Sequence, residues 1–137
     1  MKRIFILLAS IITLALAQTP APTMKQLMLD LIHPSSNDIL LAVSRDGPSD
    51  DREWALMRRS ALTLAESGSA LMTRVDSNDW RSAAKLLTDA GSDAYKAAQS
   101  KDAKALNAVT TRIDASCTNC HKQFRPNVFP GRTGGEK

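Results

Sequence analysis

Apolar residues recur every three or four positions in four stretches of the chain, and this spacing is typical of amphipathic helices. The stretches cover about residues 23–45, 50–75, 80–98 and 101–125. None of them alternates apolar and polar residues as a half-buried strand does. The pattern therefore predicts an all-α fold, an antiparallel up-down-up-down four-helix bundle, with Trp54 and Trp80 as core anchors.

Local signals refine the first two helices. Proline lacks the donor N–H and restrains the residue before it, so we expect a kink or a brief break at His33 and Pro34. The sequence RDGPSDD predicts a turn, and Asp50 with Glu53 three residues later predicts a capping box. The inward face of the first helix is expected to include Met24, Leu27, Met28, Leu31 and Ile32.

The N-terminus has the pattern of a secretory signal. Lys2 and Arg3 precede an apolar stretch over residues 4–14, and an A-x-A cleavage site follows at residues 15–17. The stretch is shorter than the about 20 residues that cross a bilayer. We therefore predict that residues 1–17 are removed on export to the periplasm, a retained anchor being the alternative. Residues 18–126 then form one domain without a membrane span, and residues 127–137 a flexible tail.

Charge gives no support for a nucleic-acid partner. The signal carries two of the 18 basic residues and none of the 14 acidic ones, so the formal net charge falls from +4 to +2 on its removal. No cluster of Lys or Arg forms a basic stripe, and we expect no nucleic-acid binding.

Both cysteines of the chain lie in the sequence CTNCH, which is Cys117 to His121. On a helix, positions i, i+3 and i+4 share one face. Two thiols at that spacing can bind the two vinyl groups of a haem as thioethers, with His121 below the iron as proximal ligand. The motif predicts one covalently attached haem c on the last helix, held by Cys117, Cys120 and His121.

Three other interpretations of the motif compete with haem attachment. A disulfide redox C-x-x-C normally accompanies a βαβ pattern, which the sequence lacks. A zinc site needs about four ligands, and His33 is the only further candidate beside the two cysteines and His121. A chance occurrence is the third.

At this point the chain resembles the cytochrome c′ family, the class II c-type cytochromes. The similarity rests on four helices, a C-x-x-C-H motif on the last of them, and the continuation CHKQFR over residues 120–125. It implies a periplasmic haem protein of the bundle type. Family members often dimerise through their first two helices, so the resemblance admits a homodimer.

The resemblance also implies a choice for the sixth iron position. In low-spin members a methionine of the first helix ligates the iron, and MKQLMLD places Met28 there. Met24 and His33 are the rival ligands, and an open position that Met28 only shields is the remaining alternative. His33 is five residues beyond Met28, about 140° round an α-helix, so the two share a face only if the Pro34 break reorients the backbone.

Other residues take roles that only the resemblance implies. Family members often carry an arginine near a haem propionate one turn before the distal ligand, where this chain has Met24; Lys25 can substitute for it. Arg125 matches the family's arginine after the motif, and either pairs with a propionate or is a solvated helix-end residue. Phe124 is expected to pack against the proximal haem face or against the core.

Three functions remain for such a chain. The first is a periplasmic monohaem electron carrier, ligated by His121 and Met28, that shuttles between redox partner proteins and is not an enzyme. The second is a five-coordinate protein that binds NO or CO. The third, a weak peroxidase, is disfavoured because the first helix shows no distal acid–base pair.

Overall fold

The computed structural model describes residues 20–127 and contains four helices in that range. Three consecutive segments form the first helix: α1 (Met24–Gln26), the π-helical η1 (Leu27–Ile32) and α2 (His33–Ser44). The other helices are α3 (Asp51–Met72), α4 (Asn78–Gln99) and α5 (Ala103–Phe124). The all-α four-helix bundle is thus confirmed. The predicted signal and nearly all of the predicted tail lie outside the described residues.

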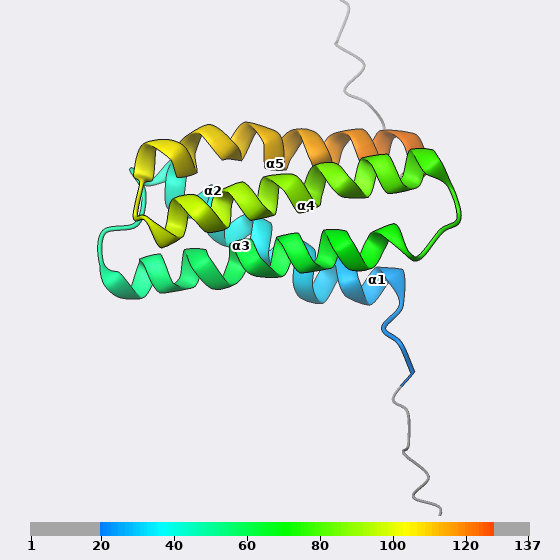
Figure 1. Ribbon diagram of the computed structural model, residues 1–137, viewed down its shortest axis with the longest axis horizontal. Helices are drawn as coiled ribbons and strands as arrows, with labels where there is room; N and C mark the ends of the chain where they lie inside the picture. Colours follow the sequence, from blue (N-terminus) through cyan, green and yellow to red (C-terminus); the bar gives the residue numbers. More distant parts are fainter. Residues whose placement is uncertain (1–19, 128–137) are drawn as a thin grey trace, which may run out of the picture.

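The helices run alternately along one long axis (Figure 1). The first helix packs against α3 and α5, and α4 packs against the same two helices, so the four form a closed ring. The start of the first helix and the end of α5 lie at the same end of the bundle. This places residues 24–33 and 117–125, far apart in sequence, on neighbouring helices.

Side-chain caps fix where α3, α4 and α5 begin. Asp50, Ser77 and Asp102 are the N-caps, and each accepts a hydrogen bond from a backbone N–H in the first turn. The capping box predicted at Asp50 is only half present, because the Glu53 carboxylate accepts from the N–H and hydroxyl of Ser49 at 2.7 and 2.9 Å. Asp50 still accepts from the N–H of Glu53 at 2.8 Å.

The first helix does not break at Pro34; it changes its hydrogen-bond pattern in the turn before it. The N–H of His33 donates to the carbonyl of Met28, five residues back. An α-helical turn would bring the proline ring against the carbonyl of Asp30, and the wider turn avoids this clash. The buried residues Leu27 and Ile32 are accordingly five apart. The predicted inward position of Leu31 is wrong, since 42% of this residue is exposed.

Helices α3 and α4 approach closely at two glycines. A Cβ at Gly91 would lie 2.4 Å from the backbone N of Ala65, and one at Gly68 would lie 2.7 Å from the backbone N of Thr88. Only glycine fits these positions without moving a backbone. Several alanines of the two helices are buried as well, among them Ala61, Ala84, Ala90 and Ala94, and side chains this small permit dense packing.

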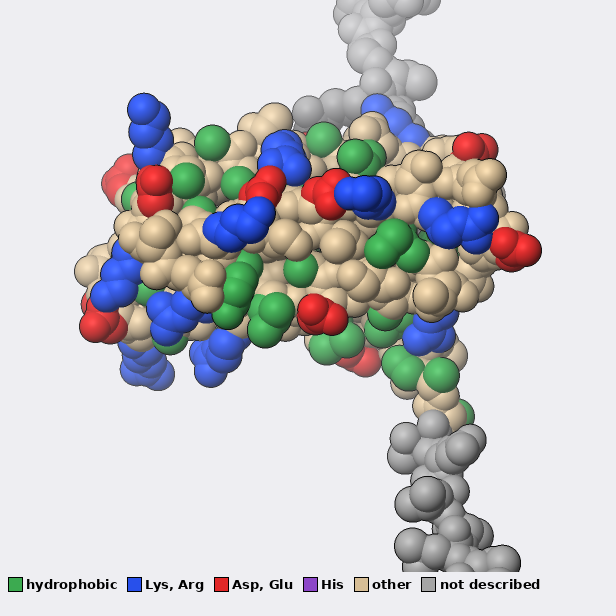
Figure 2. Space-filling model, viewed as in Figure 1, with side chains coloured by type: hydrophobic (Ala, Val, Ile, Leu, Met, Phe, Trp, Pro, Cys, Tyr) green, Lys and Arg blue, Asp and Glu red, His purple; other side chains and the backbone are tan. Residues whose placement is uncertain are grey.

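Both tryptophans are buried, which confirms them as core anchors. The indole N–H of Trp80 donates to the carbonyl of Leu71 across the α3–α4 turn, at 2.5 Å. On the surface, acidic and basic side chains alternate along α4 and α5 (Figure 2), with pairs such as Lys85–Asp89 and Arg112–Asp93. Within residues 20–127, no helix has the length and apolar character needed to span a membrane.

Candidate haem-binding site

The C-x-x-C-H motif occupies the last turns of α5, where the helix is regular. Cys117, Cys120 and His121 are each partly buried, whereas Asn119 between the cysteines is exposed. All three partly buried residues line one cavity of about 240 Å³. The i, i+3, i+4 spacing therefore directs both thiols and the imidazole to the same space, as the sequence predicted.

A second cavity, of about 450 Å³, adjoins the first at the end of the bundle. Four residues line both cavities: Met28 and Leu29 from the first helix, and Cys120 and His121 from α5. Sites for cofactors of this kind typically measure about 300–1,000 Å³ and are mainly apolar. The two cavities, both lined by Met28 and His121, together have a volume in that range.

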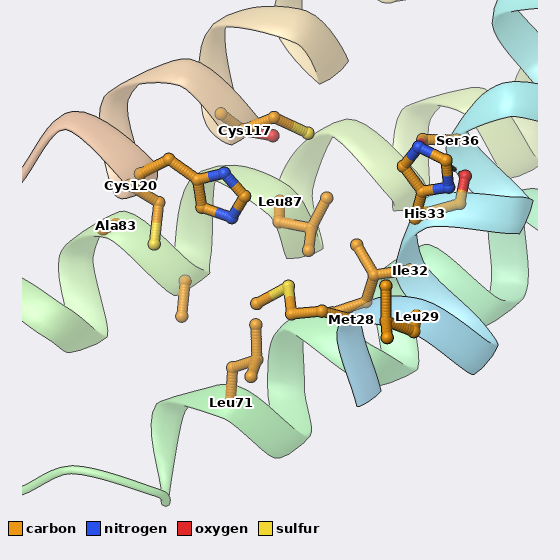
Figure 3. A pocket seen from close by; sticks show the side chains of 13 residues that line it. Met28, Leu29, Ile32, His33, Ser36, Leu71, Ala83, Leu87, Cys117 and Cys120 are labelled. Atoms are coloured by element: carbon orange, nitrogen blue, oxygen red, sulfur yellow. Dashed lines mark hydrogen bonds between the residues drawn. The ribbon is translucent and has the colours of Figure 1, made fainter. Parts of the chain in front are cut away.

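Met28, on the first helix, lines the same cavity as the motif. It is partly buried, and Figure 3 shows its side chain reaching from the first helix into the first cavity, with Cys117 and Cys120 on the α5 side. Met24 lines only the second cavity, and His33 only the first. The three ligand candidates thus all reach this region, and Met28 alone reaches both halves of it.

The position of His33 departs from the simple helical expectation. It is exposed, but it also lines the first cavity together with Met28. Pro34 reorients the backbone here, because the π-helical turn brings residues five apart toward one side. The expectation that Met28 and His33 would lie about 140° apart holds only for an unbroken α-helix.

The remaining walls of the first cavity come from all four helices. The sequence identified Leu71, Leu87 and Ala84 only as inward-facing residues, and it gave no role to Leu29, Ala83, Ser36 or Ser116. The alanines at 83 and 84 leave space beside the larger leucines. The small side chains of these two alanines are the feature of the sequence that could have indicated the first cavity.

Burial determines the charge states of the motif. It raises the pKa of the Cys117 and Cys120 thiols, which are therefore protonated at neutral pH. Burial also lowers the pKa of His121, and the nearby positive charge of Arg125 lowers it further. A neutral imidazole is the form that binds a metal.

These findings weaken two of the three rival interpretations of the motif, the redox-active C-x-x-C and the zinc site. A redox-active C-x-x-C depends on a cysteine with a lowered pKa, and here both cysteine pKa values are raised. His33 lines the same cavity as the motif, yet residues 20–127 contain no group of three or more His, Cys, Asp or Glu side chains arranged to hold a metal ion. The donor set suits a covalently attached haem better than either alternative.

Phe124 and Arg125 follow the motif and line the second cavity, as does Lys25. The ring of Phe124 packs edge-to-face on Trp80, with centroids 5.0 Å apart. Lys25 and Arg125 are exposed, and among residues 20–127 no acidic side chain lines either cavity. The second cavity therefore combines an aromatic wall with two cations at its margin.

The fold and the site together define a four-helix-bundle protein of the c-type haem class. The family model of cytochrome C′ matches residues 66–125, from the second half of α3 to the end of the motif helix. Over these residues, which make up less than half of the chain, the protein is similar to the cytochrome c′ family, whose members are c-type haem proteins and typically periplasmic. No curated protein and no solved structure matches the chain.

Proposed function

We propose that the protein is a periplasmic electron carrier with one haem c, attached through Cys117 and Cys120 and ligated by His121 and Met28. One observation carries the proposal: Met28 and His121, on facing helices, line the same two cavities. When bound, haem supplies a one-electron couple, and thioether plus imidazole ligation raises its potential. With His121 and Met28 both holding the group, such a protein would act as a shuttle between redox partner proteins and not as an enzyme.

Each residue of the site has a distinct part in this proposal. The thiols of Cys117 and Cys120 anchor the prosthetic group to α5, and His121, in its neutral form, faces the space from the same helix. Met28, on the first helix, faces the same space from the side opposite His121. Phe124 provides an apolar wall, and the cations Lys25 and Arg125 are available to pair with the carboxylates of the group.

A second candidate is a gas-binding protein in which Met28 only shields the iron. The first cavity favours it, because Ile32, Leu71 and Leu87 line the space beside Met28 with apolar surface. A small apolar molecule such as NO or CO fits such a space better than an anion does.

An optical spectrum of the purified, reduced protein with and without CO separates the two candidates. The electron carrier is expected to be low-spin and to ignore CO. A high-spin spectrum that shifts on addition of CO would refute methionine ligation and support the gas-binding alternative. As a direct check, the strongly shifted NMR signal of a ligated methionine methyl group should be present in the reduced protein and absent from Met28→Leu.

Covalent attachment is tested separately. Cys117→Ser and Cys120→Ser should lower the amount of haem that stays with the exported protein after acid–acetone extraction. Asn119→Ala is the matched control, because Asn119 lies between the cysteines and is exposed. Full haem retention in the double variant Cys117→Ser/Cys120→Ser, which can form no thioether, would contradict the attachment.

A further inference from the structure

The first helix brings two possible iron ligands to one cavity. Met28 and His33 are five residues apart, and the hydrogen bond from the His33 N–H to the Met28 carbonyl closes the π-helical turn between them. Both side chains consequently line the 240 Å³ cavity that also contains Cys117 and His121. Figure 3 shows Met28 reaching toward the middle of this cavity and His33 at one side of it.

His33 has the chemistry and the freedom of a ligand. Ser36 is a polar residue of the same helix that also lines this cavity. Its hydroxyl donates a hydrogen bond to the backbone carbonyl of His33 at 2.9 Å, and not to the imidazole. The imidazole is less well held, because its Nδ1 lies 3.5 Å from the amide nitrogen of Asn37, longer than an ordinary hydrogen bond. Since His33 is also exposed, its ring can reorient without leaving a well-packed position.

We propose that His33 is a reserve distal ligand, which binds the iron when the thioether of Met28 is absent. The inference rests on the proposed function, since it requires a haem ligated by His121. Met28 takes precedence because it reaches farther into the shared space. In the substituted state the lone pair of a neutral imidazole replaces that of the sulfur, and histidine in place of methionine lowers the potential of the haem.

The experiment compares spin states in the haem-loaded protein and its variants. Met28→Ala should stay low-spin by optical and EPR spectroscopy, with a lower reduction potential than the unchanged protein. Met28→Ala/His33→Ala should be high-spin. If His33 occupies the site at least nine-tenths of the time, CO should bind Met28→Ala about tenfold or more weakly than it binds the double variant.

Two controls isolate the role of His33. His33→Ala alone should leave the spectrum unchanged, because Met28 remains. Met28→Ala/Ser36→Ala truncates another residue of the same cavity wall and should stay low-spin, because His33 remains.

The outcomes separate this inference from the proposed function. A high-spin spectrum in Met28→Ala would overturn the role of His33 and leave methionine ligation intact. A low-spin spectrum that persists in Met28→Ala/His33→Ala would also overturn it, because another group would then be the ligand. If the unchanged protein is itself high-spin, methionine ligation fails first.

Discussion

The close approach of α3 and α4 predicts that Gly91→Ala destabilises the protein, although alanine is the better helix former. A Cβ at Gly91 would lie 2.4 Å from the N of Ala65, 2.9 Å from its Cα and 3.0 Å from the carbonyl carbon of Leu64. All three are backbone atoms, so no side chain can rotate away. Restoring ordinary contact requires the helices to separate by about 1 Å, which forfeits a quarter to a half of the dispersion energy there.

The size of the effect follows from two opposing terms. Overpacking of this kind costs up to about 3 kcal/mol, and the higher helix propensity of alanine returns about 1 kcal/mol. We therefore expect a net loss of about 2 kcal/mol in the free energy of unfolding, or a fall in Tm of roughly 8 °C for a domain of this length. Both values are measured by urea and thermal unfolding followed by far-ultraviolet circular dichroism.

Two further variants calibrate the measurement. Ser82→Ala changes an exposed position of the same helix and should alter stability by no more than about 0.5 kcal/mol. Gly68→Ala should destabilise less than Gly91→Ala, because its closest contact, at 2.5 Å, is the Thr88 hydroxyl, which can rotate, and its closest backbone contact, the N of Thr88 at 2.7 Å, is less severe than the one at Gly91. A Gly91→Ala protein as stable as the unchanged one, or more so, would refute the close approach of the two helices.

Two other predictions concern single residues on the surface. Lys101 follows the end of α4 with a φ of 54°, a backbone conformation that favours glycine. Lys101→Gly should therefore raise the free energy of unfolding by about 0.5–1 kcal/mol, measured by urea titration. This gain should exceed the loss of the exposed ion pair between Lys101 and Asp51. Hydrogen bonds from Arg112 and, to a smaller extent, Lys96 lower the pKa of Asp93 below its ordinary value of 3.8. A lowered carboxyl pKa stabilises the fold only while the carboxylate is ionised, so Arg112→Ala should lower the free energy of unfolding by about 0.2–1 kcal/mol at pH 7. This difference between the variant and the unchanged protein should shrink as the pH falls below 3.8. An Arg112→Ala deficit that stays constant down to pH 2 would contradict the second prediction.

Much of the fold was predictable because its signals are local. The helical spacing of apolar residues identified four helices, and polar residues such as Asp50 marked where they begin. The spacing of Cys117, Cys120 and His121 was equally informative, since α5 is a regular helix and the rule for its faces holds there.

The first helix was less predictable because its backbone departs from that rule. A period of 3.6 residues placed Leu31 inside, whereas Leu31 is exposed and Leu29 lines both cavities. Pro34 indicated an irregularity but not its form: a kink, a break and a wider turn all avoid the same steric clash. Packing of the helix against α3 and α5 selects among them, and this information is not local.

The site therefore depends on two helices that differ in regularity. The regular turns of α5 keep the two thiols and His121 in fixed register, which the proposed covalent attachment of a rigid ring would require. The opposite side needs only that a suitable lone pair reach the same space, and a wider turn brings Met28 and His33 there together. A regular α-helix would have turned one of these residues away, so Pro34, which contributes no ligand itself, shapes the distal side of the cavity.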